Sequence, residues 1–144
     1  MTNASLAKSY LEKAIKRLLV FPVLMEVDDF SDVVREAQET VELALKGMLR
    51  QVGIEPPKWH DVGPALLEFK GRFPESVKSD LPRLAEISAW LREERELSFY
   101  GDTDFIPTEE YTREQAERAV EDAGFAVLAA EKLIGGGHQF SRAE

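Results

Sequence analysis

The sequence predicts an all-α protein, an up-and-down four-helix bundle with one additional short helix. Between residues 31 and 52, apolar residues recur at steps of three and four, which places them on one face of a helix: Val34, Ala37, Val41, Ala44, Leu45, Met48 and Val52. No segment alternates polar and apolar residues with a period of two over a useful length, so we expect no β-sheet. Glycine and proline, which end helices, follow the periodic segment.

The predicted helix over residues 31–52 is the central element of the bundle. Its opposite face is charged, and Glu42 precedes Lys46 by four residues, the favourable orientation for a surface ion pair. Gly53 can adopt the left-handed conformation that closes a helix, and the prolines at 56 and 57 cannot continue one. We expect the apolar face of this helix to be buried, including Val41, Ala44 and Met48.

A first helix is predicted over residues 5–25 by an apolar stripe at helical spacing: Leu6, Tyr10, Ala14, Leu18, Phe21 and Met25. Pro22 should bend its last turn. Asp28, Asp29 and Ser31 can cap the central helix with their side chains. Because the connection is short, the first two helices should pack antiparallel as a hairpin.

Two further helices are predicted after the loop that contains the prolines. Asp61 is the expected N-cap of a short helix that ends near residues 71–73, and a longer helix covers about residues 81–97. The far end of the longer helix is dense in charge: Arg92, Glu93, Glu94, Arg95 and Glu96. Residues between Tyr100 and Tyr111 lack a helical period and contain turn residues, which predicts an ordered loop.

The last helix begins with a capping box formed by Thr112 and Gln115 and runs to about Ile134. Its predicted buried face consists of small residues, with Gly124 alongside: Ala116, Ala119, Val120, Ala123, Val127 and Ala130. Small residues allow a neighbouring helix to approach closely, either inside the bundle or at a subunit interface. We expect one domain over residues 1–134, followed by a flexible tail over residues 135–144.

Composition excludes several classes of function. The chain has 144 residues and no cysteine, which rules out a disulfide framework, thiolate zinc sites and cysteine nucleophiles. The longest apolar run is too short to span a bilayer, so we expect a cytoplasmic protein with no membrane partner. The net charge is −9, so binding of nucleic-acid phosphates should not dominate the energetics of the whole surface.

Several motifs occur in one order along the chain. They are AQETVELALKGML at residues 37–49, Gly53, Pro56 or Pro57, His60-Asp61, Leu66-Leu67, an Arg…Tyr-Gly-Asp segment, Pro107, Tyr111 and the alanine-rich last helix. Together they resemble the HEPN domain family (higher eukaryotes and prokaryotes nucleotide-binding domain) over about residues 10–133. The resemblance implies a four-helix core with a short extra helix that is commonly dimeric and is often encoded beside a minimal nucleotidyltransferase.

The resemblance also identifies a segment that carries catalytic residues in some members of the family. Some HEPN proteins are RNases of toxin–antitoxin pairs, and their activity rests on an Arg, usually followed by a polar residue, with a His about five positions later and often a Tyr after it. Arg95 matches that Arg, Tyr100 stands where the His should be, and Asp102 stands where the later Tyr would be. The histidines of this chain, His60 and His138, lack the required spacing.

The proton affinity of a tyrosine side chain determines what the replacement of this histidine by Tyr100 implies. RNA cleavage by the ribose 2′-hydroxyl needs a proton acceptor near neutral pH, and a tyrosine, with an ordinary pKa of about 10, is mostly protonated there. The leading prediction is therefore a non-catalytic dimeric partner of a minimal nucleotidyltransferase, or a nucleotide-binding module whose ligand contacts Arg95, Tyr100 and Asp102. The alternative is a divergent toxin-type endoribonuclease that uses Arg95 and Tyr100 on RNA. A third interpretation is a structural dimer without a ligand.

The other polar candidates each have a structural interpretation. His60 and Asp61 could form a catalytic pair or a metal site, but a metal site would need further ligands, so we expect them to lock the loop onto a neighbouring helix. Arg95 could equally be a buried residue paired with a nearby carboxylate such as Asp102. Asp102 and Asp104 lack the glycine and the late glutamate of a calcium loop. We predict no metal and no cofactor.

Two other sets of residues, a polar row and the two tryptophans, can each be interpreted in more than one way. Gln38, Glu39 and Glu42 could be a functional polar row or a solvated flank of the central helix. Trp59 and Trp90 are expected to anchor the core or an interface. A homodimer is predicted because the last helix and the aromatic-bearing helix before it offer more apolar surface than one small bundle readily covers.

Overall fold

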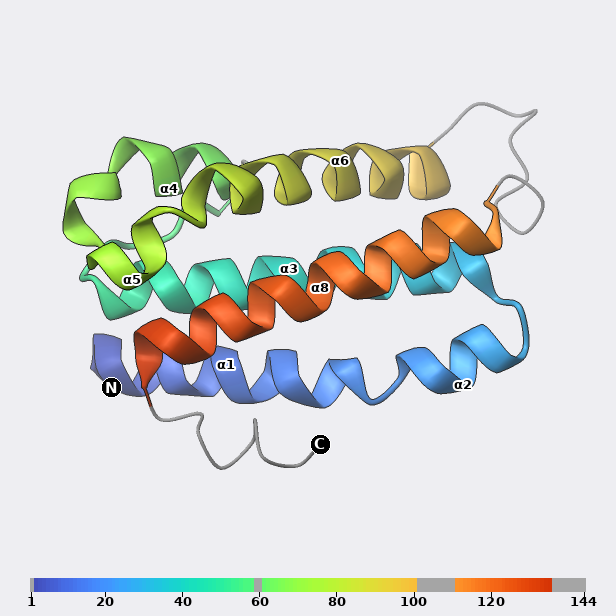
Figure 1. Ribbon diagram of the computed structural model, residues 1–144, viewed down its shortest axis with the longest axis horizontal. Helices are drawn as coiled ribbons and strands as arrows, with labels where there is room; N and C mark the ends of the chain where they lie inside the picture. The colour runs from blue at the N-terminus through green and yellow to red at the C-terminus, as the bar shows by residue number, and fades with distance from the viewer. Residues whose placement is uncertain (1, 59–60, 101–110, 136–144) are drawn as a thin grey trace.

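The computed structural model describes residues 2–58, 61–100 and 111–135, with residues 95–100 described by their backbone alone. The described chain is helical and contains no strand, which confirms the predicted all-α class. Its helices are α1 (Asn3–Leu18), α2 (Phe21–Glu26), α3 (Phe30–Gln51), α4 (Gly63–Glu68), α5 (Glu75–Lys78), α6 (Leu81–Tyr100) and α8 (Arg113–Ile134). Figure 1 shows α1, α3, α6 and α8 side by side along the length of the molecule.

Helix α3 lies at the centre of the bundle because it packs against α1, α6 and α8. The predicted core residues Val41, Ala44 and Met48 are all buried. The helix ends as expected: Gly53 has a φ of 84° and its N–H donates to Arg50 O at 3.0 Å, while the next N–H donates to Leu49 O at 2.9 Å. This pattern of two bonds around a left-handed residue satisfies carbonyls that the helix itself leaves free.

The prediction of one bent helix over residues 5–25 is wrong, because α1 stops at Leu18 and α2 starts at Phe21. Pro22 has no N–H to donate, and its ring would clash with the carbonyl of Leu18 in a continuous helix. It is tolerated at the second position of α2, where that N–H needs no partner. The predicted antiparallel packing of the first helix on the central one is present, with α1 lying along α3.

The predicted side-chain caps of the central helix are also wrong. Asp29 occupies the N-cap position of α3, but its carboxylate makes no capping hydrogen bond, and Ser31 lies inside the helix. Asp28 adopts a left-handed backbone with a φ of 57°, and its carboxylate lies 2.5 Å from the guanidinium of Arg113 on α8. The Asp28 carboxylate therefore forms a tertiary ion pair with α8 and caps no helix.

The segment after the proline loop is more broken than predicted. Helix α4 ends at Glu68, a 3₁₀ turn covers Lys70–Arg72, and α5 (Glu75–Lys78) was not predicted. Helix α4 packs closely on α6, since a Cβ added at Gly63 would lie 3.1 Å from the Cα of Ala85. Helix α6 extends to Tyr100, three residues past its predicted end near residue 97.

Helix α8 agrees with the sequence prediction at both ends. Gln115 N–H donates to Thr112 Oγ1 at 3.1 Å and Thr112 N–H donates to Gln115 Oε1 at 2.9 Å, which forms the capping box. The alanines of its predicted small face are buried. Gly124 does not contribute to close packing among the described residues, because a Cβ added there would meet none of their atoms within 4 Å. The loop and tail predicted over residues 101–110 and 136–144 lie outside the described residues.

Candidate functional site

The predicted ligand-binding segment lies at the carboxyl end of α6. Arg95 and Tyr100 are on one continuous helix, five residues apart, which corresponds to a rise of about 7.5 Å along its axis. Asp102 and His60 lie outside the described residues. The structure therefore gives the helical backbone of the Arg95–Tyr100 pair, and its function as a site remains a prediction.

Tyr111 connects this end of α6 to the start of α8. Its hydroxyl donates to the backbone carbonyl of Glu94 at 3.0 Å, immediately before Arg95, and the side chain is buried. Burial of the hydroxyl, with a smaller contribution from the nearby Glu94 carboxylate, raises the pKa of Tyr111 well above its ordinary value. The neutral hydroxyl thus holds the peptide that precedes Arg95.

Replacing Tyr111 with Phe should lower the free energy of unfolding by about 1 kcal/mol at pH 7, since a buried hydrogen bond is lost. In the wild type the pKa is higher in the folded than in the unfolded chain, so this contribution is complete below about pH 10 and declines as pH rises above it. Urea unfolding of both proteins at pH 7 and at several alkaline pH values measures this. An identical alkaline decline in the Tyr111→Phe variant would contradict the assignment.

Asp61 joins the loop before α4 to helix α6. Its Oδ1 accepts a hydrogen bond from Gly63 N–H at 3.0 Å and another from the hydroxyl of Ser88. Asp61 was expected to be the N-cap of this helix, but Val62 occupies that position. Asp61 lies one residue earlier and accepts the N–H of Gly63, the first residue of α4. Among the described residues, no three Asp, Glu or His side chains are grouped so that they could hold a metal ion.

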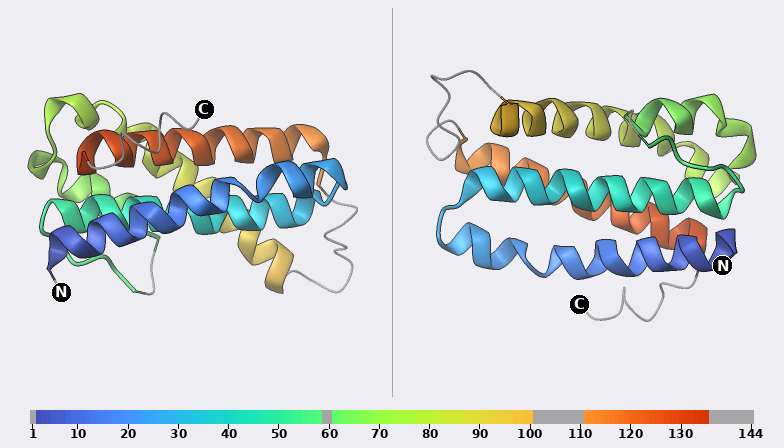
Figure 2. Two further views of the ribbon diagram at one scale, coloured as in Figure 1. Left: turned by 90° about the horizontal axis from the view of Figure 1, so that it is seen from below. Right: turned by 180° about the vertical axis from the view of Figure 1, so that it is seen from behind.

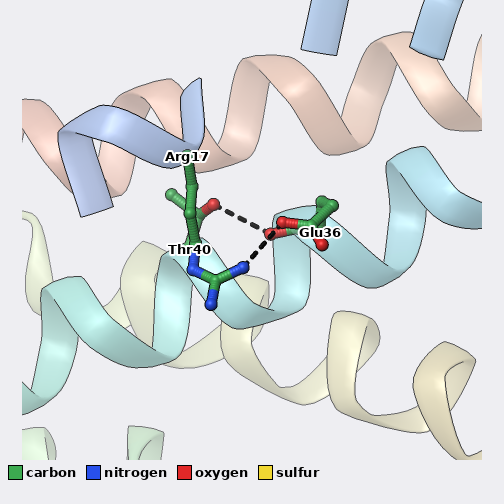
Figure 3. Close-up of polar contacts among 3 residues, drawn as sticks. All are labelled: Arg17, Glu36 and Thr40. Atoms are coloured by element: carbon green, nitrogen blue, oxygen red, sulfur yellow. Dashed lines mark hydrogen bonds and ion pairs between the residues drawn. The ribbon is translucent and has the colours of Figure 1, made fainter. Parts of the chain in front are cut away.

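A second candidate surface is a groove between α1 and α3. It encloses about 460 Å³ and is lined by Lys13, Lys16, Arg17, Val20 and Glu36. Arg17 Nη1 donates to Glu36 Oε1 at 2.8 Å, and both side chains are partly exposed (Figure 3). The groove therefore carries three cations and one carboxylate on a chain whose net charge is −9.

The backbone at Glu36 is tied down as well. Thr40 is buried, and its hydroxyl donates to Glu36 O at 2.8 Å, one helical turn earlier, as Figure 3 shows. The carboxylate of Glu36 consequently projects from a fixed turn of α3 towards Arg17. Arg17 and Glu36 are 19 positions apart in the sequence, and they meet because α1 packs on α3.

A third polar cluster joins α6 to α8. Trp90 Nε1 donates to Asp122 Oδ2 at 2.9 Å, and Asp122 is buried. Arg83 and Arg118 lie 3.6 and 3.7 Å from the same carboxylate, and the Arg118 guanidinium lies 4.1 Å from the centre of the Trp90 ring. Asp122 was missed from the sequence. Its signal was an acidic residue directly beside Ala123, within a stripe of buried alanines.

The polar row on α3 contains one buried member. Gln38 is buried and donates to Glu42 Oε1 at 2.8 Å, and Glu42 Oε2 lies 2.9 Å from Lys46 Nζ. The predicted Glu42–Lys46 pair is therefore present. These side chains bind one another along the helix, and those of Glu42 and Lys46 are only partly exposed.

The described structure defines the class of this protein: an all-α bundle built around one long central helix, with a charged and aromatic end to α6. No described helix is long and apolar enough to cross a membrane. The sequence profile of the HEPN domain matches residues 7–133, so the chain belongs to the HEPN domain family.

One relative shows how far the resemblance extends. The protein named "Putative toxin MJ1304" of Methanocaldococcus jannaschii is 27% identical over 128 residues, which cover 84% of this chain and 83% of the relative. The similarity therefore extends over most of both chains.

Proposed function

We propose that this chain is a dimeric HEPN-domain interaction protein that binds a nucleotidyltransferase and does not cleave RNA. The observation that carries this proposal is Tyr100, five residues after Arg95 on α6, at the position of the catalytic imidazole of HEPN RNases. A phenol near its ordinary pKa of about 10 stays protonated at pH 7 and is a poor base for a ribose hydroxyl.

The surroundings of Arg95 support binding over catalysis. Three glutamates, at positions 93, 94 and 96, flank Arg95 in the sequence, and this excess of negative charge makes a poor site for an RNA backbone. Tyr111 fixes the peptide before Arg95, which suits a rigid recognition surface. HEPN proteins are often encoded beside a minimal nucleotidyltransferase, which is the partner we propose. A nucleotide held near Arg95, Tyr100 and Asp102 is a related form of the same proposal.

A second candidate function is a toxin-type endoribonuclease that uses Arg95 and Tyr100. The observation that favours it is the relative from Methanocaldococcus jannaschii, whose name contains the word toxin. This function would require a group other than imidazole to exchange the proton of the 2′-hydroxyl.

An RNase assay on the purified full chain separates the two functions. We expect no cleavage of RNA above the buffer background at pH 7. Cleavage that is lost in Arg95→Ala or Tyr100→Phe, but kept in the matched variants Arg92→Ala and Tyr10→Phe, would establish the endoribonuclease instead.

The binding half of the proposal has its own measurement. Capture with the tagged chain from a lysate of its source organism should retain a nucleotidyltransferase, identified by mass spectrometry. Arg95→Ala should reduce that capture while Arg92→Ala, three residues earlier on α6, should not. Equal capture by both variants would remove Arg95 from the binding surface.

A further inference from the structure

Helix α1 is a basic element in an acidic chain. Its 16 residues contain four cations and one carboxylate, whereas the whole chain has a net charge of −9. Three of the cations line the groove between α1 and α3: Lys13, Lys16 and Arg17. They lie at steps of three and four residues along the helix, so they share one of its faces. Positive charge is therefore concentrated at one place on a chain that is negative as a whole.

The carboxylate that lines this groove is already paired. Glu36 Oε1 accepts the hydrogen bond from Arg17 Nη1, and the hydroxyl of Thr40 holds the backbone carbonyl of Glu36 (Figure 3). Lys13 and Lys16 are both exposed, and neither forms an ion pair with any described residue. Three cations against one carboxylate leave the groove with an excess of two positive charges.

The groove also has room for a small molecule and an apolar wall. Its volume of about 460 Å³ lies within the range of small-ligand sites, about 300–1,000 Å³. Val20, which is 39% exposed, lines it beside the aliphatic stems of the lysines. The backbone stays helical at Val20, with φ and ψ of −80° and −27°, so its side chain follows the face that carries Lys16 and Arg17. A ligand that is anionic at one end and apolar at the other matches this lining.

We propose that the groove binds a phosphomonoester, with the phosphate held by Lys13, Lys16 and Arg17 and the organic group lying against Val20. A phosphomonoester carries a charge of about −1.5 to −2 at pH 7, which balances the excess positive charge of the groove. A guanidinium has five N–H donors, so its bond to Glu36 leaves Arg17 with donors for phosphate oxygens. The Glu36 carboxylate acts as a positioning group, because it holds the guanidinium at the groove.

Charge distinguishes this ligand from other anions. A carboxylate carries a single negative charge and would leave part of the positive excess unbalanced. A nucleic-acid backbone is also a poor match, because it needs a row of cations and the net charge of −9 repels a polyanion at long range. A single small dianion meets the local cations and is too compact to extend over the acidic surface.

The groove lies apart from the carboxyl end of α6. Figures 1 and 2 show α1 and α6 at opposite edges of the bundle, with α3 and α8 between them. A phosphomonoester in the groove would therefore occupy a site separate from the one proposed at Arg95, and the inference does not depend on the proposed function.

Titration of the ¹⁵N-labelled full chain with phenyl phosphate, followed by the NMR shifts of its amides, tests the inference. At about pH 7.5 and low ionic strength the ligand is mostly a dianion, and we expect saturable shifts that are largest at residues 13–20 and at Glu36. The dissociation constant should be on the order of 1 mM. Lys13→Ala and Lys16→Ala should each raise it about threefold to tenfold.

Lys8→Ala is the matched control, because it removes an exposed lysine from the same helix outside the groove. It should change the dissociation constant by less than about twofold. An equal weakening by Lys8→Ala and Lys16→Ala would show general attraction to α1 and overturn the site. The amide spectrum of each variant also verifies that the bundle is folded.

Two further probes identify the chemistry that the groove recognises. Inorganic phosphate should bind at the same residues at least about threefold more weakly than phenyl phosphate, because it lacks the apolar group. Benzoate, with one negative charge, should bind at least about fivefold more weakly. Tighter binding of inorganic phosphate would assign the groove to the free anion and overturn the ester, and equal binding of benzoate would overturn recognition of a dianion. Absence of saturable shifts at the groove, or shifts only at the carboxyl end of α6, would overturn the inference entirely.

Discussion

Replacing Met48 with Ala should lower the free energy of unfolding by about 2–5 kcal/mol. Met48 lies on the buried face of α3 and its side chain has no solvent exposure. Helix α3 packs against α1, α6 and α8, so its buried side chains are enclosed on several sides. The shortened side chain would lose its transfer energy from water and leave a cavity that this packing cannot readily close.

Urea unfolding followed by circular dichroism measures this loss. The matched control is Leu128→Ala, which shortens an apolar side chain that is 56% exposed on α8 and should change stability by less than about 0.5 kcal/mol. If Met48→Ala unfolded at the same urea concentration as the wild type, the position of α3 at the centre of the core would be wrong.

Replacing Asp122 with Ala should cost about 1–3 kcal/mol, because it leaves the indole N–H of Trp90 without its acceptor. The Asp122 carboxylate is 9% exposed and joins α6 to α8 through that 2.9 Å bond. The two arginines beside it are 49% and 61% exposed, so their ion pairs are screened by water and should add little. The indole hydrogen bond therefore accounts for most of the expected loss.

Glu121→Ala is the matched control for Asp122→Ala, because Glu121 is the preceding residue on α8 and is exposed. Both variants remove one carboxylate from the same helix, so they change the net charge equally. Chemical unfolding should separate them by at least about 1 kcal/mol. Equal stability of the two variants would show that the Trp90–Asp122 bond contributes nothing measurable.

The helices that the sequence predicted best are those whose limits are encoded locally. Helix α8 begins at a capping box and α3 ends at Gly53, and both signals depend on residues within one or two turns. The break at residues 19–20 was missed because periodicity continues through it. The local rule for Pro22 permits either a bend or a new helix start, and here α2 starts anew. Helix α5 has only four residues, too few to show a period.

One part of the candidate site was likewise predictable from local sequence. The sequence alone shows that Tyr100 follows Arg95 by five residues, at the position where the resemblance calls for a histidine. This prediction depends only on residue type and on spacing along one helix. The chemical character of these two residues needs no knowledge of the packing.

Only the tertiary structure decided which distant residues meet. Arg17 reaches Glu36, Tyr111 reaches the carbonyl of Glu94, and Trp90 reaches Asp122 across separations of 19, 17 and 32 residues. Each contact depends on how two helices are rotated and shifted against each other, and side-chain packing across the whole core sets that geometry. For the same reason the sequence determined that Leu19, Val23 and Val27 are apolar, whereas the packing of α1 and α2 on α3 and α8 decided that they stay exposed.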